Sequence, residues 1–206
     1  TDSELSKILL YHVYDGSVPA SAVADGMMAE MMNGDKVSFT NDGTTVMVGS
    51  ATVTQADVAA SNGIIHVIDK VLMPPTDIPT TASGTGIHNT LVNAVVDANL
   101  LSTLEGEGPF TVFAPTDQAF TDLGVDLSTL SQSELSDILL YHVVGAEVPA
   151  SAVTDCMSAD AANTQPLSFT VGESGVMVND ANVIMADVFS SNGLIHVIDK
   201  VLMPTD

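Results

Sequence analysis

The sequence predicts an α+β fold in which each of two related units places its helices first and an antiparallel sheet last. The main observation is a repeat, because SNGLIHVIDKVLMP at residues 191–204 reproduces SNGIIHVIDKVLMP at residues 61–74. Ahead of each copy stand several short runs rich in β-branched residues and separated by Asn, Asp and Gly, a pattern typical of a β-meander. Ahead of those runs, apolar residues recur with helical spacing.

Each unit contains a short amphipathic helix with its own start signal. Thr1 and Glu4 precede the run LSKILLYHV, and Ser131 and Glu134 precede LSDILLYHV. A Ser or Thr followed three residues later by Glu forms a capping box, in which each side chain bonds the backbone of the other residue. The pattern therefore predicts a helix at both places.

A second short helix is predicted where a proline opens the shared motif VPASAV, at residues 18–23 and 148–153. Residues 24–37 and 154–167 differ most between the units, so we expect surface loops there. Four methionines crowd the first of these loops, and we interpret them as gap-filling core residues, with partner binding as the alternative. They are Met27, Met28, Met31 and Met32.

Strands are predicted at residues 37–40, 44–50 and 51–58, with counterparts in the second unit. The repeated run closes the sheet, and its residues are apolar on both faces, so we expect an interior strand. Its polar residues need hydrogen-bond partners, because an unpaired buried group costs about 1–3 kcal/mol. These residues are His66 and Asp69 in one copy and His196 and Asp199 in the other. We expect both histidines to be buried structural residues, with a ligand or metal role as the alternative.

Residues 77–86 are predicted to be a linker, because they are rich in Gly, Pro and small polar residues without periodicity. Apolar residues between 91 and 101 then keep helical spacing, with Asn89 or Thr90 as the cap. A strand follows in GPFTVFAP and ends at Pro115, after which Thr116 or Asp117 can cap a further helix.

Composition excludes several classes of function. The 206 residues carry 26 acidic and 4 basic side chains, for a formal net charge of −22. Almost nothing remains to neutralise phosphates or anionic lipid headgroups, so nucleic acid and direct membrane insertion are poor expectations. Cys156 is the single cysteine, which excludes an intrachain disulfide. No nucleotide-binding, zinc-protease or serine-hydrolase motif is present, and we expect no catalysis, cofactor or metal site.

Three motifs in order carry a family resemblance. TVFAPTDQAF at 111–120, LLYHVV at 139–144 and SNGLIHVIDKVLMP at 191–204 resemble the fasciclin-type domain. The resemblance implies an antiparallel β-wedge, or half-barrel, with helices packed on it. It covers residues 87–206 as a complete domain and residues 1–76 as the C-terminal part of another, in tandem. Motif residues with an implied structural role are Thr111, Pro115, Thr116, Asp117, Tyr11, His12, His66, Asp69, His196 and Asp199.

The resemblance also implies a function. Fasciclin-type domains are secreted or cell-surface modules for adhesion or matrix contact, and their partners are proteins or glycans. In animal members the Tyr-His motif and a nearby Asp-Ile segment are linked to integrin contact. The matching residues are Asp137, Ile138, Leu139, Tyr141 and His142, for which a structural role is the alternative. The first unit has Lys7 where the second has Asp137, and so departs from the motif.

Two other classes of function stay open at this stage. The charge and the methionines suit an acidic secreted carrier or sensor of divalent cations or a small molecule, and an enzyme is a third hypothesis. Residues 1–76 match residues 131–206 without a gap at 44 positions, yet nothing in front of them corresponds to residues 87–130. We therefore expect the first unit's sheet to be open on one side, to be completed by an upstream segment or by self-association through domain swapping.

Overall fold

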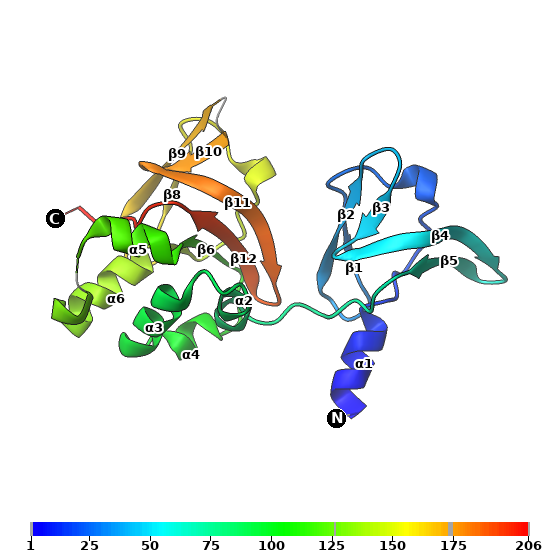
Figure 1. Ribbon diagram of the computed structural model, residues 1–206, viewed down its shortest axis with the longest axis horizontal. Helices are drawn as coiled ribbons and strands as arrows, with labels where there is room; N and C mark the ends of the chain where they lie inside the picture. Colours follow the sequence, from blue (N-terminus) through cyan, green and yellow to red (C-terminus); the bar gives the residue numbers. More distant parts are fainter. Residues whose placement is uncertain (1, 126, 173–174, 206) are drawn as a thin grey trace. The chain divides into compact units, whose positions relative to one another are not determined.

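The computed structural model describes residues 2–125, 127–172 and 175–205. Its contacts divide the chain into two compact units, Thr1–Pro75 and Thr76–Asp206 (Figure 1). Each unit has its own sheet and its own apolar core. The α+β fold class is confirmed.

The first unit is mostly sheet. Its helix α1 (Asp2–Leu10) and a 3-10 turn (Ala20–Ala22) precede five strands. The strands are β1 (Met28–Glu30), β2 (Lys36–Asn41), β3 (Val46–Val48), β4 (Ala51–Ala60) and β5 (Gly63–Ile68). Their order in the sheet is β1-β2-β3-β4-β5, with every pair antiparallel. The predicted meander is therefore present, and β5 lies at its edge.

The second unit places helices before its sheet, as predicted. The helices are α2 (Ile78–Gly84), α3 (Asn89–Asp97), α4 (Leu101–Leu104), α5 (Asp117–Leu123) and α6 (Gln132–Tyr141), with 3-10 turns at Leu127–Thr129 and Ala150–Ala152. The strands are β6 (Phe110–Pro115), β7 (Val143–Val144), β8 (Ser158–Asp160), β9 (Pro166–Gly172), β10 (Gly175–Val178), β11 (Ala181–Ser190) and β12 (Gly193–Ile198). They form one nearly closed, barrel-like sheet in the order β7-β6-β12-β11-β10-β9-β8.

One pairing in this sheet departs from the predicted antiparallel arrangement. β6 runs parallel to β12, with Phe110 opposite Gly193 and Pro115 opposite Ile198. A parallel pair cannot be joined by a tight hairpin, and here the intervening chain forms α5, α6 and the remaining strands. β12 consequently lies between β6 and β11, and its prediction as an interior strand is confirmed.

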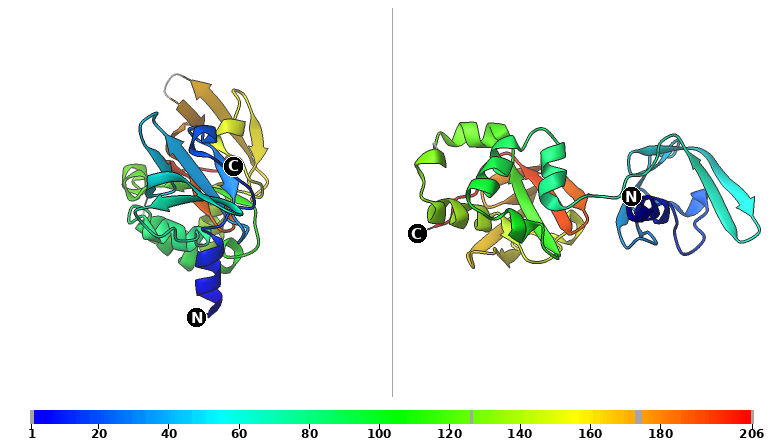
Figure 2. Two further views of the ribbon diagram at one scale, coloured as in Figure 1. Left: turned by 90° about the vertical axis from the view of Figure 1, so that its right-hand side faces the viewer. Right: turned by 90° about the horizontal axis from the view of Figure 1, so that it is seen from below.

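Two apolar cores fill the second unit, one on each face of β6 and β12. The green helices cover one face of these strands (Figure 2), and the core between them includes Val112, Ala114 and Ile195. On the other face, Phe113 and Ile198 pack inside the curved sheet. This division follows from strand geometry, since neighbouring residues point to opposite faces.

The predicted helix starts are largely present. Ser131 accepts a bond from the Glu134 N–H, and the Glu134 carboxylate accepts one from the Ser131 N–H, which completes the capping box of α6. The first capping box involves Thr1, which lies outside the described residues. At α3 the predicted caps Asn89 and Thr90 are wrong, because the residue before the helix is His88, whose side chain makes no cap bond.

The predicted linker at residues 77–86 is mostly helical. Asp77 caps α2 by accepting a bond from the Thr80 N–H, and Ile78 and Ala82 are buried in the core of the second unit. This helix was not predicted because its sequence, IPTTASG, consists mainly of small residues and lacks a long stripe of apolar residues at helical spacing. The Asp-x-Pro start is the signal that indicates it.

The expected loop at residues 24–37 contains strand β1, and residues 154–167 contain β8, so both predictions are wrong in part. Among the methionines, Met31 belongs to the core of the first unit, as interpreted, whereas Met28 and Met32 are exposed.

Candidate functional site

The Tyr-His motif of the second unit is built into its core. Tyr141 ends α6, and its hydroxyl donates to the Pro166 carbonyl at 3.1 Å and accepts from the Asn179 amide at 2.9 Å. His142 Nε2 accepts from the Leu202 N–H at 2.8 Å. His142 Nδ1 must then carry the proton and donate to the Ile138 carbonyl, also at 2.8 Å. The motif therefore ties α6 to β9 and to the chain end.

Burial fixes the charge of His142. The side chain is 1% exposed, and burial lowers its pKa to about 4, which the hydrogen bond to Ile138 only partly offsets. His142 is neutral at physiological pH and both ring nitrogens are occupied by backbone groups. It is thus placed as a structural residue and has no free nitrogen for a substrate or a metal.

The five residues with an implied adhesion role are separated by burial. Ile138, Leu139, Tyr141 and His142 are all buried, whereas Asp137 is exposed. In this structure a partner can therefore touch only Asp137 among them. Its carboxylate accepts from the Asn163 amide at 3.2 Å, so Asp137 and Asn163 form a small polar surface on the outer side of α6.

The Tyr-His motif of the first unit makes the equivalent bonds to backbone groups in a different environment, without the amide bond that Asn179 donates to Tyr141. Tyr11 is buried and donates to the Lys36 carbonyl, and burial followed by the charge of Asp35 raises its pKa to about 12. His12 bonds the Ile8 carbonyl and accepts from the Leu72 N–H, yet its side chain is exposed. The two histidines thus share their hydrogen bonds to backbone groups, but only His142 is buried.

His196 confirms the prediction of a buried, hydrogen-bonded histidine. Its Nε2 bonds the Val148 carbonyl at 2.8 Å, and its Nδ1 accepts from the Asp187 N–H at 3.2 Å. Its ring also stacks on Phe113, with centroids 5.4 Å apart. For His66 the prediction of burial is wrong. It keeps the bond to the Val18 carbonyl, but it is half-buried because β5 is an edge strand.

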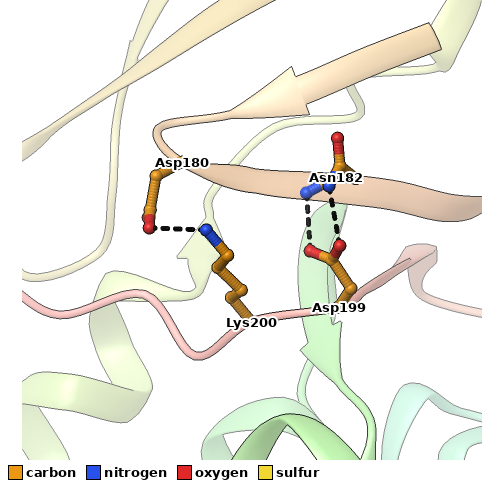
Figure 3. Close-up of polar contacts among 4 residues, drawn as sticks. All are labelled: Asp180, Asn182, Asp199 and Lys200. Carbon is orange, nitrogen blue, oxygen red and sulfur yellow. Dashed lines mark hydrogen bonds and ion pairs between the residues drawn. The ribbon is translucent and has the colours of Figure 1, made fainter. Parts of the chain in front are cut away.

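Asp199 holds the end of β12 to the start of β11. Its two carboxylate oxygens accept from the backbone and side-chain nitrogens of Asn182, each at 2.7 Å (Figure 3). Beside it, Lys200 pairs with Asp180 at 3.1 Å on the exposed surface. In the first unit Asp69 accepts the equivalent backbone bond from Thr52. Both aspartates are therefore clamps between neighbouring strands.

The residues of the β6 motif position the strand and the helices around it. The buried Thr111 hydroxyl donates to the Ala146 carbonyl and accepts from the Val148 N–H, and Thr116 caps α5 by accepting from the Ala119 N–H. Pro115 ends the strand, as predicted.

Asp117 caps a helix other than its own. Its carboxylate accepts from the Thr90 N–H at 2.7 Å and from the Asn89 amide at 3.0 Å, at the start of α3. Burial opposes its ionisation, but these hydrogen bonds outweigh that effect and lower the pKa of Asp117. A capping role toward α3 was not predicted, because the sequence places these residues 27 positions apart.

Two further structural residues escaped sequence reasoning. His88 is completely buried, with Nδ1 2.7 Å from the Thr85 hydroxyl, and burial lowers its pKa. The Asn192 amide donates to the carbonyls of Leu104 and Gly106, and its oxygen accepts from the Ile78 N–H. The Asn-Gly pair indicated a turn, but no neighbouring residue in the sequence indicated that the Asn192 side chain bonds two distant segments of the chain.

The described residues contain no cluster of three His, Cys, Asp or Glu side chains suited to a metal. Cys156 is exposed and its backbone has a φ of 62°, a conformation that Gly26 supplies in the first unit. Within the described part of the chain, no helix is long and apolar enough to cross a membrane. The shared motif residues thus build a scaffold, and the surface around it carries the acidic side chains.

Residues 1–74 and 87–204 match the family model described as the Fasciclin domain. The chain belongs to the fasciclin family. Protein sll1483 of Synechocystis is 40% identical over 162 residues, which cover 76% of this chain and 89% of that protein. The pig transforming growth factor-beta-induced protein ig-h3 is 31% identical, and the match covers 98% of this fasciclin chain but 30% of that protein.

A solved structure supports the fold of this fasciclin chain. It is a domain pair from the insect cell adhesion molecule fasciclin I, matched with a TM-score of 0.57 over 98% of this chain and 81% of that one. Its sequence is 22% identical, so the match concerns the fold alone.

Proposed function

We propose that this protein is an extracellular adhesion or matrix-contact module that binds a protein or glycan through its surface, without catalysis. The proposal rests on the observation that the side chains of the shared motifs are occupied in building the fold. Tyr141, His142 and His196 are buried and bonded to backbone groups, so they build the fold and leave recognition to exposed residues.

Relatives support the adhesion class. Ig-h3 and human periostin align with 98% of the chain, and the matched insect protein is described as a cell adhesion molecule. The chain spans 30% or less of the length of those two vertebrate proteins, so their full activities are not transferred.

The contact surface that we propose centres on Asp137. It is the exposed member of the implied adhesion segment, and Asn163 beside it offers a second polar group. A carboxylate with a neighbouring amide suits a partner that presents a cation, an amide or hydroxyl groups. An exposed pair of this kind gives specificity and a salt-dependent association rate more than raw affinity.

The experiment is capture by the immobilised 206-residue chain of purified cell-surface proteins, matrix proteins and an array of glycans. We expect at least one saturable partner whose binding weakens severalfold with Asp137→Ala. Asp160→Ala is the matched control, since Asp160 is also exposed but lies on β8. Absence of binding in all three sets would refute the adhesion function, and equal binding by both variants would refute the role of Asp137.

A further inference from the structure

An apolar cavity lies inside the second unit, between its helices and its sheet. Its volume is about 70 Å³, and its wall is formed by residues of α2, α3, α4, α6, β6, β7 and β12 and of the loops beside them. The helices α2, α3 and α4 lie together on this side of the unit (Figure 1). Protein interiors contain few voids larger than a water molecule, so a cavity of this size is an unusual feature of a packed core.

The interior of the cavity offers no free polar group to water. Among its described lining residues, Thr103 and His142 alone have polar side chains. His142 already bonds backbone groups through both ring nitrogens, and Thr103 is exposed to solvent. A buried water needs about two to four polar partners, and cavities without them stay dry. The cavity is therefore suited to an apolar group.

The volume and the opening of the cavity restrict the shape of its occupant. An engineered cavity of about 150 Å³ binds benzene, so less than half of that volume accepts the end of an unbranched alkyl chain but not a ring. The wall includes exposed Thr103 and Ala162 and half-buried Leu101 and Leu140, so the cavity reaches the surface of the unit. The remainder of a longer molecule can therefore extend into solvent.

The charges near the opening indicate the head group of such a molecule. Glu105 and Glu107 lie close to Thr103 in the sequence, and both are exposed. Lys200 is the single basic residue in the sequence from 76 to 206. This negative field repels a carboxylate head group and does not repel a hydroxyl or an ammonium group. The Thr103 hydroxyl can also form a hydrogen bond with a hydroxyl head group.

We propose that the second unit binds the end of an unbranched alkyl chain with an uncharged or cationic head group, such as an alkyl alcohol or an alkyl amine. The chain end is buried in the cavity against Ala82, Val92 and Ile195, and the head group stays in solvent beside α4. This site goes beyond the proposed adhesion function, because Asp137 is exposed and does not line the cavity.

The test is titration of the 206-residue chain with 1-hexanol, followed through the methyl NMR signals of Val92 and Val95, which line the cavity. We expect saturable binding of one molecule per chain, weakened about fourfold for each methylene removed from the buried part of the chain. Cyclohexanol has the same number of carbon atoms in a ring and should bind at least tenfold more weakly. At low salt, hexanoate should bind more weakly than hexylamine.

The protein variant is Ala82→Leu, which fills the cavity from α2 and should weaken binding of 1-hexanol at least tenfold. Ala186→Leu is the matched control, because Ala186 is exposed on β11 and the same added side chain there should leave binding unchanged. Val92→Ala acts in the opposite direction. It widens the cavity at a half-buried position and should strengthen binding of cyclohexanol.

Three results would each overturn the proposal: absence of saturable binding, equal binding of 1-hexanol and cyclohexanol by the unaltered chain, or full binding by a folded Ala82→Leu variant. If Ala82→Leu does not fold, Val92→Ala decides, and no gain for cyclohexanol would refute the site. Hexanoate that binds as tightly as hexylamine would refute the choice of head group. Asp137→Ala should leave the titration unchanged, which separates this site from the adhesion surface.

Discussion

His142 and His12 show how one set of hydrogen bonds exists in two environments. Each ring bonds a helix carbonyl through Nδ1 and accepts a backbone N–H through Nε2. His142 is buried, which lowers its pKa from 6.5 to about 4, and His12 is exposed. The unfolded chain therefore binds a proton on His142 before the folded chain does, and acid destabilises the second unit.

The resulting prediction concerns stability against pH. The contribution of His142 is complete above about pH 6.5 and is lost progressively as pH falls to about 4, by about 3 kcal/mol in total. Urea denaturation of the second unit between pH 7 and 4 measures it. His142→Gln should flatten this slope, with the remainder due to buried His88 and, toward pH 4, to carboxylates such as Asp117 whose pKa is lowered in the fold. His12→Gln lies in the first unit and serves as the control variant. An unaltered slope in His142→Gln would contradict the assignment.

A second prediction compares His196 with His66. His196→Leu leaves the Val148 carbonyl and the Asp187 N–H without their partner in a buried site, which should lower the free energy of unfolding by about 1–3 kcal/mol. His66→Leu should cost less, because water can reach the half-buried site. Chemical denaturation of both variants provides the measurement, and equal effects would show that burial does not decide the cost.

At the level of residues, the alternation of the repeated strand predicted that His196 needs partners, and it has them. The same alternation failed for His66, since burial of a strand depends on neighbours that its own sequence does not encode. The roles of Asp117 and Asn192 could not be predicted from neighbouring residues for a related reason. Their hydrogen bonds reach residues 27 and 88 positions away, and only the folded topology brings those together.

Among the secondary-structure elements, α3 depends on a residue outside its own sequence. The preceding residue His88 makes no side-chain cap bond, and Asp117 accepts the Thr90 N–H instead. The prediction of caps at Asn89 or Thr90 followed the composition of the segment and missed this distant carboxylate. The capping box of α6, in contrast, is local and was predicted from Ser131 and Glu134.

We predict that Asp117→Ala destabilises the second unit by about 0.5–2 kcal/mol, the range for loss of a helix cap. Hydrogen exchange of the first turn of α3 should accelerate in the same variant, because the Thr90 N–H loses its acceptor. Asp160→Ala removes an exposed carboxylate of the same charge and serves as the control. Stability equal to that of the control would contradict the capping role.

For the whole molecule, charge is distributed unequally. The first unit has nine acidic and three basic residues, for a formal net charge of −6, and the second has seventeen and one, for −16. The sequence alone gives both net charges, because counting charged residues requires no knowledge of the fold. We expect the negative charge of both units to keep copies of the protein apart at neutral pH.

Lowering the pH toward the sequence pI of about 4.1 should therefore promote association as the repulsion disappears. Light scattering at pH 7, 5 and 4 measures the effect, with circular dichroism to separate association of folded chains from acid unfolding. More association at pH 7 than near pH 4 would contradict the prediction. Added salt should raise association at pH 7 by screening the same charges.

Six apolar side chains that are exposed in the first unit and buried at the corresponding positions of the second also set the order in which the chain denatures. They are Leu5, Leu9, Val13, Ile65, Val67 and Val71. Because these side chains are already exposed in the folded first unit, unfolding exposes less additional apolar surface there. The free energy of unfolding of the first unit should therefore fall less steeply with urea concentration. It also lacks the helix-covered core of the second unit, so its midpoint should come first. Equilibrium denaturation should then show two steps, a shallow one followed by a steep one, and a chain at intermediate urea would keep only residues 76–206 folded.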